Sequence, residues 1–322
     1  MTSDPISIPT TVDNAILKVD GREVRLTNLR KLFWPALKIT KGALIQYYAD
    51  VASYLLPHIR DRAMVMRRYP NGAAGEQFFM KEAPSPRPPW IRICSIDHSG
   101  KVVNFPVIDD RPSLLWVINL GCIDLNQWYS RCDDVNRPDY VHFDLDPSEG
   151  ATFEQVRECG LIVRDALETL GMTPYVKTTG SRGLHVYVPI VRGPEQDVVL
   201  TFAKTLAGEL AARNPMLMTL DYRVARRPRE RVLVDYKQNA WGQTLASIYS
   251  VRPRPLATVS TPLTWNEVAK GAHIEDFRID NVRARLKKRG DVWKGLLATK
   301  GRTDLLRFFG KPAASRRSTR TS

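Results

Sequence analysis

The sequence lacks a hydrophobic segment long enough to cross a membrane. Its longest apolar candidate, Leu114–Ile123, is interrupted by Asn119 and Gly121 and falls short of the roughly 18 residues that a transmembrane helix needs. The first residues, MTSDPISIPTTVDN, contain neither a basic n-region nor an apolar h-region, so no secretory signal is predicted. These absences predict a protein of the cytoplasm.

Cysteine is also scarce, with four residues in the chain: Cys94, Cys122, Cys132 and Cys159. None of them forms a C-x-x-C pair or a Cys/His cluster with zinc-finger spacing, so neither a disulfide framework nor a structural zinc site is predicted. The rest of the composition is ordinary for a globular protein. With 43% hydrophobic and 25% charged residues among 322, the chain is long enough for one large domain with a buried core.

Positive charge is in excess and is unevenly distributed. The chain has 48 lysines and arginines against 34 acidic residues, a net charge of +14. Residues 281–322 hold 13 basic and two acidic residues, a net +11, which leaves only +3 for the rest of the chain. A second cluster, Arg223–Arg231, holds five arginines. Such local excess favours a polyanionic partner, most often nucleic acid, whereas a solvated tail that aids solubility is the alternative.

The order of apolar strands and amphipathic helices predicts a mixed α/β (α+β) fold without internal repeats. A hairpin is expected at 18–26, followed by a helix that Thr40 caps and Pro57 ends. Further strands are expected at 63–68, 91–96, 101–105, 140–145, 175–178, 184–190 and 232–236, and further helices at 113–125, 153–170 and 195–212. Residues 1–20 are predicted to be a lead-in, 21–302 a single domain, and 303–322 a basic, disordered tail.

Two aspartates stand near the end of an apolar strand, in the segment DYVHFDLDP (139–147). Alternate residues of a strand face opposite sides, so His142, Asp144 and Asp146 share one face while the apolar residues between them face a core. Carboxylates two residues apart can converge on one or two hard divalent cations. Pro147 ends the strand, which predicts an open sheet end. The alternative is a polar strand end followed by an Asp-Pro turn.

A polar turn that contains glycine lies between two strands in YVKTTGSRGLHVYVPI (175–190). Gly180 and Gly183 allow backbone amides to point at one spot. Hydroxyl, guanidinium and imidazole groups accompany them: Thr179, Ser181, Arg182 and His185. This combination favours a cradle for phosphate groups, although no Walker motif G-x-x-x-x-G-K-[ST] is present. An ordinary hairpin turn with a structural histidine is the alternative.

A third acidic residue, Asp235, lies in the apolar strand of RVLVDY (231–236). Burying a carboxylate there is costly without a partner, which a metal ion or an arginine would supply. Together, the three carboxylates of Asp144, Asp146 and Asp235 and the phosphate cradle fit metal-assisted phosphoryl chemistry on a nucleoside triphosphate. A salt bridge from Asp235 to a nearby arginine is the alternative.

The segments FDLDP, TGSRGLHVYVP and LVDYKQN, in this order, resemble the three motifs of the archaeo-eukaryotic primase superfamily. The chain is more closely similar to the polymerase domain of bacterial DNA ligase D, which acts in non-homologous end joining. Flanking segments agree over about residues 15–300, including LTNLRKLFWP, MRRYPNG, QFFMKEAP and YSVRPRP. The resemblance implies a primase-type catalytic core with mixed β-sheets flanked by helices. It also implies an enzyme that extends DNA primers at broken ends and typically prefers ribonucleotides and manganese.

The resemblance assigns roles to single residues. It implies that Asp144, Asp146 and Asp235 bind two divalent ions, Mn²⁺ or Mg²⁺. It implies triphosphate or nucleotide contacts for Thr179, Ser181, Arg182, His185 and Arg252.

The resemblance also predicts DNA contacts. Lys31 and Lys41 match the family's pocket for the 5′-phosphate of the downstream strand, and a solvated surface is the alternative for either lysine. Phe78 and Phe79 match an aromatic pair that stacks against template bases. Core packing is the alternative for this pair.

The chain departs from the family at Asn126, in IDLNQW, where members usually have a histidine that helps to hold the incoming nucleotide. Asparagine forms hydrogen bonds but carries no charge, so the activity or the sugar preference is expected to differ. The pattern K-x-D-G of ligases occurs once, as KVDG at 18–21, where it forms the turn of the hairpin predicted at 18–26 and is not interpreted as a ligase motif. We therefore expect a free-standing, nucleoid-associated polymerase that acts with Ku and a separate ATP-dependent ligase. A non-catalytic DNA-end-binding module and a D-x-D nucleotide-sugar transferase are the alternatives.

Overall fold

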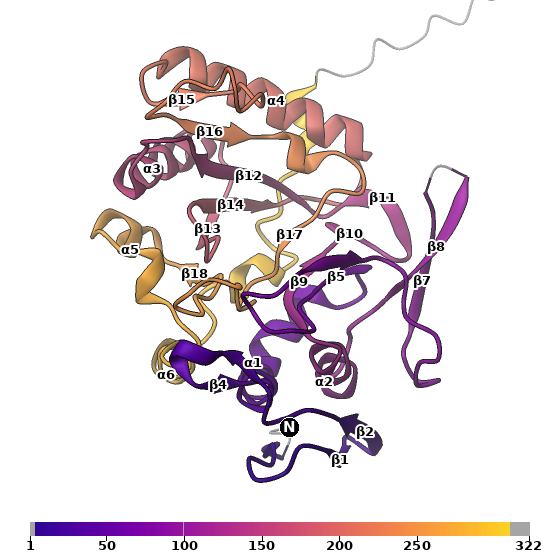
Figure 1. The fold of residues 1–322 in the computed structure, drawn as a ribbon. Coiled ribbons are helices and arrows are strands. Elements are labelled where there is room, and N and C mark those ends of the chain that lie inside the picture. The colour runs from indigo at the N-terminus through magenta and orange to yellow at the C-terminus, as the bar shows by residue number, and fades with distance from the viewer. Residues whose placement is uncertain (1–3, 99, 310–322) are drawn as a thin grey trace, which may run out of the picture.

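The computed structural model describes residues 4–98 and 100–309. Two sheets form its centre (Figure 1). The larger has six strands, in the order β15 (Met218–Thr219), β16 (Val232–Asp235), β12 (Tyr140–Pro147), β14 (Leu184–Pro189), β13 (Tyr175–Thr178) and β18 (Pro262–Leu263). The smaller has four, in the order β17 (Leu245–Ala246), β9 (Cys122–Gln127), β5 (Met64–Arg68) and β6 (Phe78–Met80). The predicted mixed α/β (α+β) class is therefore confirmed.

Helices cover both sheets. Helices α3 (Phe153–Thr169) and α4 (Gln196–Arg213) pack on the six-stranded sheet, and α1 (Lys41–Ile59) and α2 (Arg111–Asn119) lie below the four-stranded one (Figure 1). Helix α3 begins at a capping box of Thr152 and Gln155, and its buried residues recur at helical spacing, as the sequence predicted. None of the helices within the described residues has the length and apolar composition that a membrane crossing requires.

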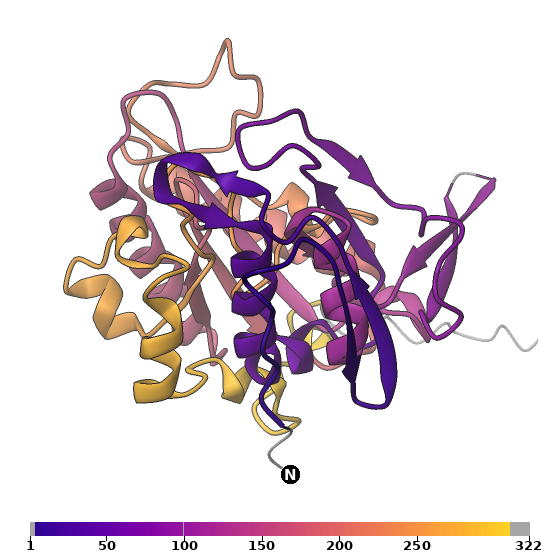
Figure 2. The ribbon, with the colours of Figure 1, turned by 60° about the horizontal axis from the view of Figure 1, so that its bottom comes forward.

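Hairpins and short helices complete the molecule. The hairpin of β7 (Ile93–His98) and β8 (Lys101–Pro106) projects from the body in two views (Figures 1 and 2). The other paired strands are β1 (Ala15–Val19) with β2 (Arg22–Leu26), β3 (Leu32–Trp34) with β4 (Ile39–Thr40), and β10 (Ser130–Arg131) with β11 (Asp134–Pro138). The remaining helices are η1 (Pro35–Leu37), η2 (Lys237–Asn239), α5 (Trp265–Ala269), η3 (Ile274–Asp276), α6 (Val282–Arg289), η4 (Lys294–Leu297) and η5 (Leu305–Phe308).

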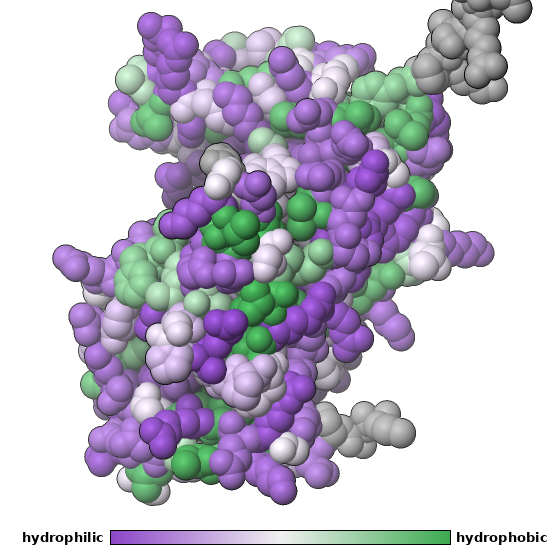
Figure 3. Space-filling view, turned by 90° about the vertical axis from the view of Figure 1, so that its right-hand side faces the viewer, coloured by the Kyte–Doolittle hydropathy of each residue, from purple (hydrophilic) through white to green (hydrophobic). Residues whose placement is uncertain are grey.

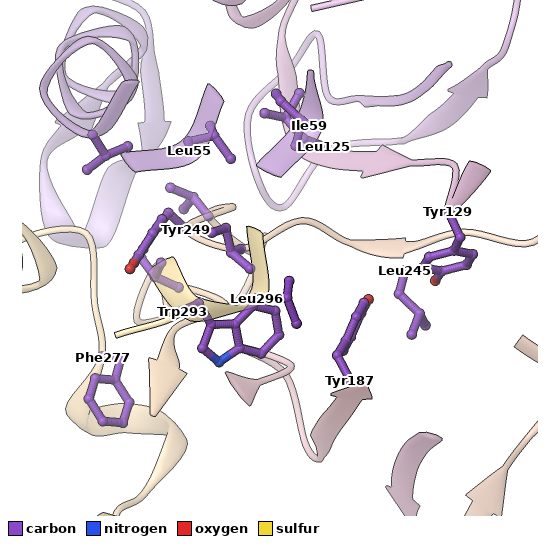
Figure 4. Close-up of a cluster of buried hydrophobic side chains, with 14 of the residues drawn as sticks. Leu55, Ile59, Leu125, Tyr129, Tyr187, Leu245, Tyr249, Phe277, Trp293 and Leu296 are labelled. Carbon is purple, nitrogen blue, oxygen red and sulfur yellow. The ribbon is translucent and has the colours of Figure 1, made fainter. Parts of the chain in front are cut away.

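One hydrophobic cluster runs through both sheets. The part drawn in Figure 4 joins Leu55 of α1, Leu125 of β9 and Tyr187 of β14 around Trp293. The Trp293 indole is buried, and its N–H donates to the carbonyl of Val176 at 2.9 Å, so its polar atom is satisfied. The segment that follows α6 therefore packs where the two sheets meet. On the face seen in Figure 3, hydrophilic side chains predominate and hydrophobic ones are scattered.

The predicted helix at 113–125 is wrong in its second half. Helix α2 ends at Asn119, Gly121 turns the chain with φ of 83°, and β9 follows. All six residues of β9 are buried because the strand lies between β5 and β17. A strand buried on both faces lacks the alternation that separates a strand from a buried helix in a sequence. Because β9 is a strand, Asp124 and Asn126 lie on the same face of the sheet.

Two predicted boundaries also differ from the structure. The Thr303 amide donates to the Pro189 carbonyl at 3.0 Å, and Leu305 is fully buried, so residues 303–309 belong to the fold. The rest of the predicted tail, 310–322, lies outside the described residues. Pro57 does not end α1, which continues to Ile59. Pro57 and Ser53 are both exposed, so water can bind the carbonyl that the proline leaves without a partner.

Candidate active site

Three aspartates lie side by side where β12 and β16 pair. Asp144 is the cross-strand partner of Asp235, and Asp146 lies two residues further along β12. Directly opposed residues point to the same face of a sheet, as do residues i and i+2, so the three carboxylates share one face. Exposed fractions of 17% for Asp144 and 33% for Asp146 show that this face is only partly open to solvent.

Burial makes these carboxyl groups difficult to ionise. It raises the pKa of Asp144 to about 6, although the charges of Lys177 and Arg252 act in the opposite direction. Burial and then the charge of Asp144 raise the pKa of Asp146. The same two causes raise the pKa of Asp235, against hydrogen bonds such as the one that Gln238 donates. A cation bound on this face would therefore stabilise the ionised form of the three carboxylates.

The donor chemistry of this face suits a hard divalent cation, because carboxylate oxygens are the ligands that such ions prefer. As the side chains lie, however, no three His, Cys, Asp or Glu residues among 4–98 and 100–309 are arranged to hold an ion. Asp146 instead faces two arginines, with Arg182 Nη2 at 3.0 Å and Arg227 Nη1 at 3.7 Å. An ion would have to displace these guanidinium groups from Asp146. The residues fit a divalent ion by chemistry, and their side chains must rotate to bind it.

A row of polar residues crosses the sheet at Asp144. In the strand pairing, His185 of β14 lies directly opposite Lys177 of β13 on one side and Asp144 of β12 on the other. Asp144 in turn lies directly opposite Asp235 of β16. His185 Nε2 lies 3.3 Å from Asp144 Oδ1, and His185 Nδ1 lies 2.7 Å from Lys177 Nζ. Lys177 Nζ also donates to the carbonyl of Ala246 at 2.9 Å. Burial lowers the pKa of both His185 and Lys177. The sequence indicated His185 but not Lys177, because only the strand register makes Lys177 its neighbour.

The predicted phosphate loop, residues 179–183, connects β13 to β14. The Thr179 hydroxyl accepts hydrogen bonds from the amides of Ser181, Arg182 and Gly183 at 3.0 to 3.1 Å. The amides that the sequence predicted to point at a phosphate therefore converge on Thr179 Oγ1. Ser181 Oγ and the Arg182 guanidinium remain as the groups that the loop presents outward.

Close packing explains both glycines of this loop. A Cβ atom at Gly183 would lie 2.0 Å from the carbonyl oxygen of Leu145, and one at Gly180 would lie 2.7 Å from the Arg252 side chain. Gly180 also has φ of 65°, which favours glycine. Gly183 thus lets the loop lie against β12, next to Asp146, and Gly180 lets it lie against Arg252 and the backbone of Val259 and Ser260.

Two arginines approach the loop from the segment after β17. Arg252 Nη1 donates to the carbonyl of Thr179 at 2.6 Å, so Arg252 contacts the back of the loop. Arg254, which sequence reasoning did not single out, donates to Ser181 Oγ. Arg254, Ser181 and Arg182 together line a cavity of about 390 Å³. Arg227 and Arg254 were missed because arginines in basic segments carry no signal that separates site residues from surface residues.

Asn126 lies behind this row. Its side chain is buried, and its Nδ2 donates to the carbonyl of Asp124 at 3.3 Å. Its cross-strand partner is Ala246, whose carbonyl accepts from Lys177. His142, expected on the face of Asp144, is buried against two tyrosine rings. The centre of its imidazole ring lies 4.0 Å from the centre of the Tyr129 ring and 5.3 Å from that of the Tyr187 ring.

The two predicted phosphate-binding lysines lie close together. Lys31 is exposed, and its Nζ donates to the carbonyl of Pro70 at 2.8 Å. Lys41, at the start of α1, is buried, and its Nζ donates to the carbonyl of Thr27 at 2.7 Å. Burial, and then the charges of Lys31 and Arg68, lower the pKa of Lys41 to about 8. An anion bound between Lys31 and Lys41 would stabilise the charged form of Lys41.

Phe78 and Phe79 stand on the edge strand β6, with exposed fractions of 42% and 61%. Core packing, the alternative that the sequence left open, does not apply to them. The guanidinium carbons of Arg68 and Arg67 lie 5.1 Å and 5.3 Å from the centres of the Phe78 and Phe79 rings. Each ring thus has an arginine on one side and solvent available on another.

Comparisons with known proteins agree with the motifs. A family model described as the LigD primase-polymerase domain matches residues 40–293. The multifunctional non-homologous end joining protein LigD of Mycolicibacterium smegmatis is 35% identical over 84% of this chain. The bifunctional LigD of Bacillus subtilis is 31% identical over 83% of it. The chain covers 35% and 43% of these two proteins, respectively.

A solved structure shares the fold. The polymerase domain of Mycobacterium tuberculosis ligase D, in complex with DNA, matches with a TM-score of 0.81 at 30% identity. The match covers 86% of this chain and 98% of that one. The family resemblance that the motifs indicated is thus confirmed.

Proposed function

This chain belongs to the LigD primase-polymerase family, and from that premise we propose that it is a template-directed nucleotidyltransferase. It would extend DNA ends or fill gaps during non-homologous end joining. The observation that carries the proposal is the face of Asp144, Asp146 and Asp235 beside the loop 179–183. Three carboxylates with raised pKa values next to outward-facing arginines suit a triphosphate that arrives with divalent cations.

In this proposal Asp144, Asp146 and Asp235 hold two divalent ions, Mn²⁺ or Mg²⁺. Ions held by these carboxylates would supply the positive charge that neutralises the triphosphate and the leaving pyrophosphate, and would favour ionisation of the primer 3′-hydroxyl. The chain's own side chains bind and orient the nucleotide. Ser181, Arg182 and Arg254 surround the cavity and would bind the phosphates.

Polar groups behind the loop 179–183 and along the row at Asp144 have supporting roles in the proposal. Arg252 and Thr179 keep the loop in position through their 2.6 Å hydrogen bond. His185, fixed between Lys177 and Asp144, would contact the triphosphate. Asn126 would influence which sugar is accepted, because an amide replaces the usual histidine behind the site.

The DNA contacts follow the same logic. We propose that Lys31 and Lys41 bind the 5′-phosphate of the downstream strand, where an anion would relieve their mutual repulsion. Phe78 and Phe79 would stack on template bases, which is tolerant of sequence and suits irregular broken ends. The one K-x-D-G match in the sequence, KVDG at 18–21, forms the turn of the β1–β2 hairpin. In this proposal the filled end would therefore be sealed by a ligase active site elsewhere. In this proposal Ku would bring this polymerase and the ligase to the DNA end, at the nucleoid.

The decisive experiment is primer extension on a gapped, 5′-phosphorylated DNA with Mn²⁺, comparing ribonucleotides with deoxyribonucleotides. Extension by the wild type and not by Asp144→Ala is the expected result, and the ratio of the two sugars measures the effect of Asn126. Tight DNA binding without extension would overturn the proposal in favour of a DNA-end-binding module. Transfer of sugar from a nucleotide sugar, without primer extension, would instead indicate a glycosyltransferase.

A further inference from the structure

Asp124 is a buried acidic residue to which the motifs give no role. It lies in the middle of β9 with none of its surface exposed. Two arginines approach its carboxylate. Arg252 Nε lies 2.8 Å from Oδ1, and Arg67 Nη1 donates to Oδ2 at 3.2 Å.

Each of these arginines connects Asp124 to a different part of the proposed site. Arg252 donates to the carbonyl of Thr179, in the loop 179–183. Arg67, on β5, is the cross-strand partner of Phe79 and lies under its ring. One buried carboxylate therefore contacts both the arginine behind the phosphate loop and the arginine behind an exposed phenylalanine.

Asp124 also offsets a concentration of positive charge. Burial and the charges of Arg252, Arg182 and Arg67 lower the pKa of Arg254, whereas the charge of Asp124 raises it. Without Asp124 these arginines would repel one another before any triphosphate was present. An arginine side chain also has many rotamers, and fixing them before binding removes an entropy cost from the binding step.

We propose that Asp124 is a positioning residue for nucleotide and template binding. It holds Arg252 against the phosphate loop and Arg67 beneath Phe79, so that both ligands meet side chains that are already in place. The inference rests on the proposed function and adds to it a specific anchor, which itself touches no reacting atom.

The test compares Asp124→Asn with a matched control, Asp139→Asn. Asp139 is likewise buried and paired with two arginines, with Arg62 Nη2 at 2.6 Å and Arg131 Nε at 3.1 Å, but it lies before β12, away from Asp144. Binding of a non-hydrolysable ribonucleoside triphosphate with Mn²⁺ is measured at equilibrium, and KM and kcat are measured by primer extension. We expect Asp124→Asn to raise the nucleotide Kd and KM about tenfold or more while kcat per folded molecule falls less than about threefold. Asp139→Asn should leave the nucleotide Kd and KM within about twofold of the wild-type values.

A double-mutant cycle with Arg252→Lys identifies the route. If Asp124 acts through Arg252, the double variant should be no worse than the poorer single variant, whereas multiplied effects would overturn the inference. Unchanged Kd and KM in Asp124→Asn would also overturn it, even if the wild type extends primers. A wild type that binds nucleotide but extends no primer would refute the proposed function and leave the binding comparison intact.

A second background keeps the test available if Asp124→Asn fails to fold. The second background is Arg67→Met, in which Arg252 is the one arginine that loses its ion pair when Asp124→Asn is added. The nucleotide Kd of the double variant is compared with the nucleotide Kd of Arg67→Met alone. A rise of about tenfold supports the inference and equal values overturn it.

Discussion

Strand β12 has acidic residues near both of its ends, in opposite surroundings. At its beginning, Asp139 accepts hydrogen bonds from Arg62 Nη2 at 2.6 and 2.8 Å and from Arg131 Nε at 3.1 Å. Arg62 is fully buried and lies 4.7 Å from the centre of the Tyr140 ring. Every charge at this end has a partner supplied by the chain.

At the other end of β12, Asp144 and Asp146 share a face with a third carboxylate, Asp235, and the pKa of each is raised. Aspartate thus completes the fold just before β12, whereas at the other end the carboxyl pKa values stay raised even though Arg182 and Arg227 lie beside Asp146. Buried ion pairs that the chain completes itself serve architecture, whereas clustered carboxyl groups whose pKa values stay raised are typical of sites that bind a charged ligand.

The largest effect expected from this comparison is on catalysis at the open end. Asp144→Ala should lower the rate of nucleotide addition by several orders of magnitude, because both charge neutralisation and positioning by divalent ions depend on this carboxylate. Single-turnover primer extension measures the rate, and circular dichroism and DNA binding serve as controls for the fold. A rate within about tenfold of the wild type would contradict the assignment of Asp144 to the metal site.

The closed end should respond in stability instead. Asp139→Asn leaves two guanidinium groups without a buried counter-charge, so we expect it to lower the free energy of unfolding by about 3–5 kcal/mol. Urea unfolding at pH 7.5 measures this loss. The rate of nucleotide addition per folded molecule should stay that of the wild type. A catalytic defect without a loss of stability would remove the distinction between the two ends.

The pH dependence of stability should show what ionising Asp144 costs the folded state. The folded pKa of Asp144 is about 6, above the unfolded value of about 3.9, so the folded state holds this proton more strongly. Without metal, this group therefore costs stability as pH rises from about 4 to above 6. In EDTA, Asp144→Asn should be more stable than the wild type at pH 7.5, by about 1–3 kcal/mol, and the difference should shrink towards pH 4.5. An Asp144→Asn variant that is less stable at pH 7.5 would speak against an uncompensated carboxylate.

The smallest expected effect concerns basic residues outside the described part of the chain. Residues 310–322 hold four cations and no acidic residue. Deleting them should weaken DNA binding modestly and flatten its dependence on salt, by about 0.9 in slope for each DNA phosphate that these cations neutralise. Arg131→Gln, which removes a cation that the fold already pairs with Asp139, should leave the slope unchanged. An unchanged slope after the deletion would assign the tail to solubility.

Much of the site could be predicted from local patterns. The alternation in DYVHFDLDP placed Asp144 and Asp146 on one strand face, and the apolar strands around the loop 179–183 were located to within a few residues. The contacts of that loop were not predictable, because the amides turned to Thr179 Oγ1 rather than outward. Whether amides are satisfied by a neighbouring hydroxyl or left for a ligand depends on side-chain rotation that spacing does not encode.

Short segments of the sequence were enough to establish the fold class, the family and the candidate carboxylates, because strand period, turn residues and motif order are local properties. Three relationships became visible only in the folded chain: Asp235 lies opposite Asp144, Lys177 lies next to His185, and Asp124 stands in a strand between two arginines. Asp144 and Asp235 are distant in the chain, as are Asp124 and its arginines, whereas Lys177 and His185 belong to one hairpin and meet through its register. They come together because burying whole faces of two sheets selects which strands pair and in which register, and no single segment carries that information.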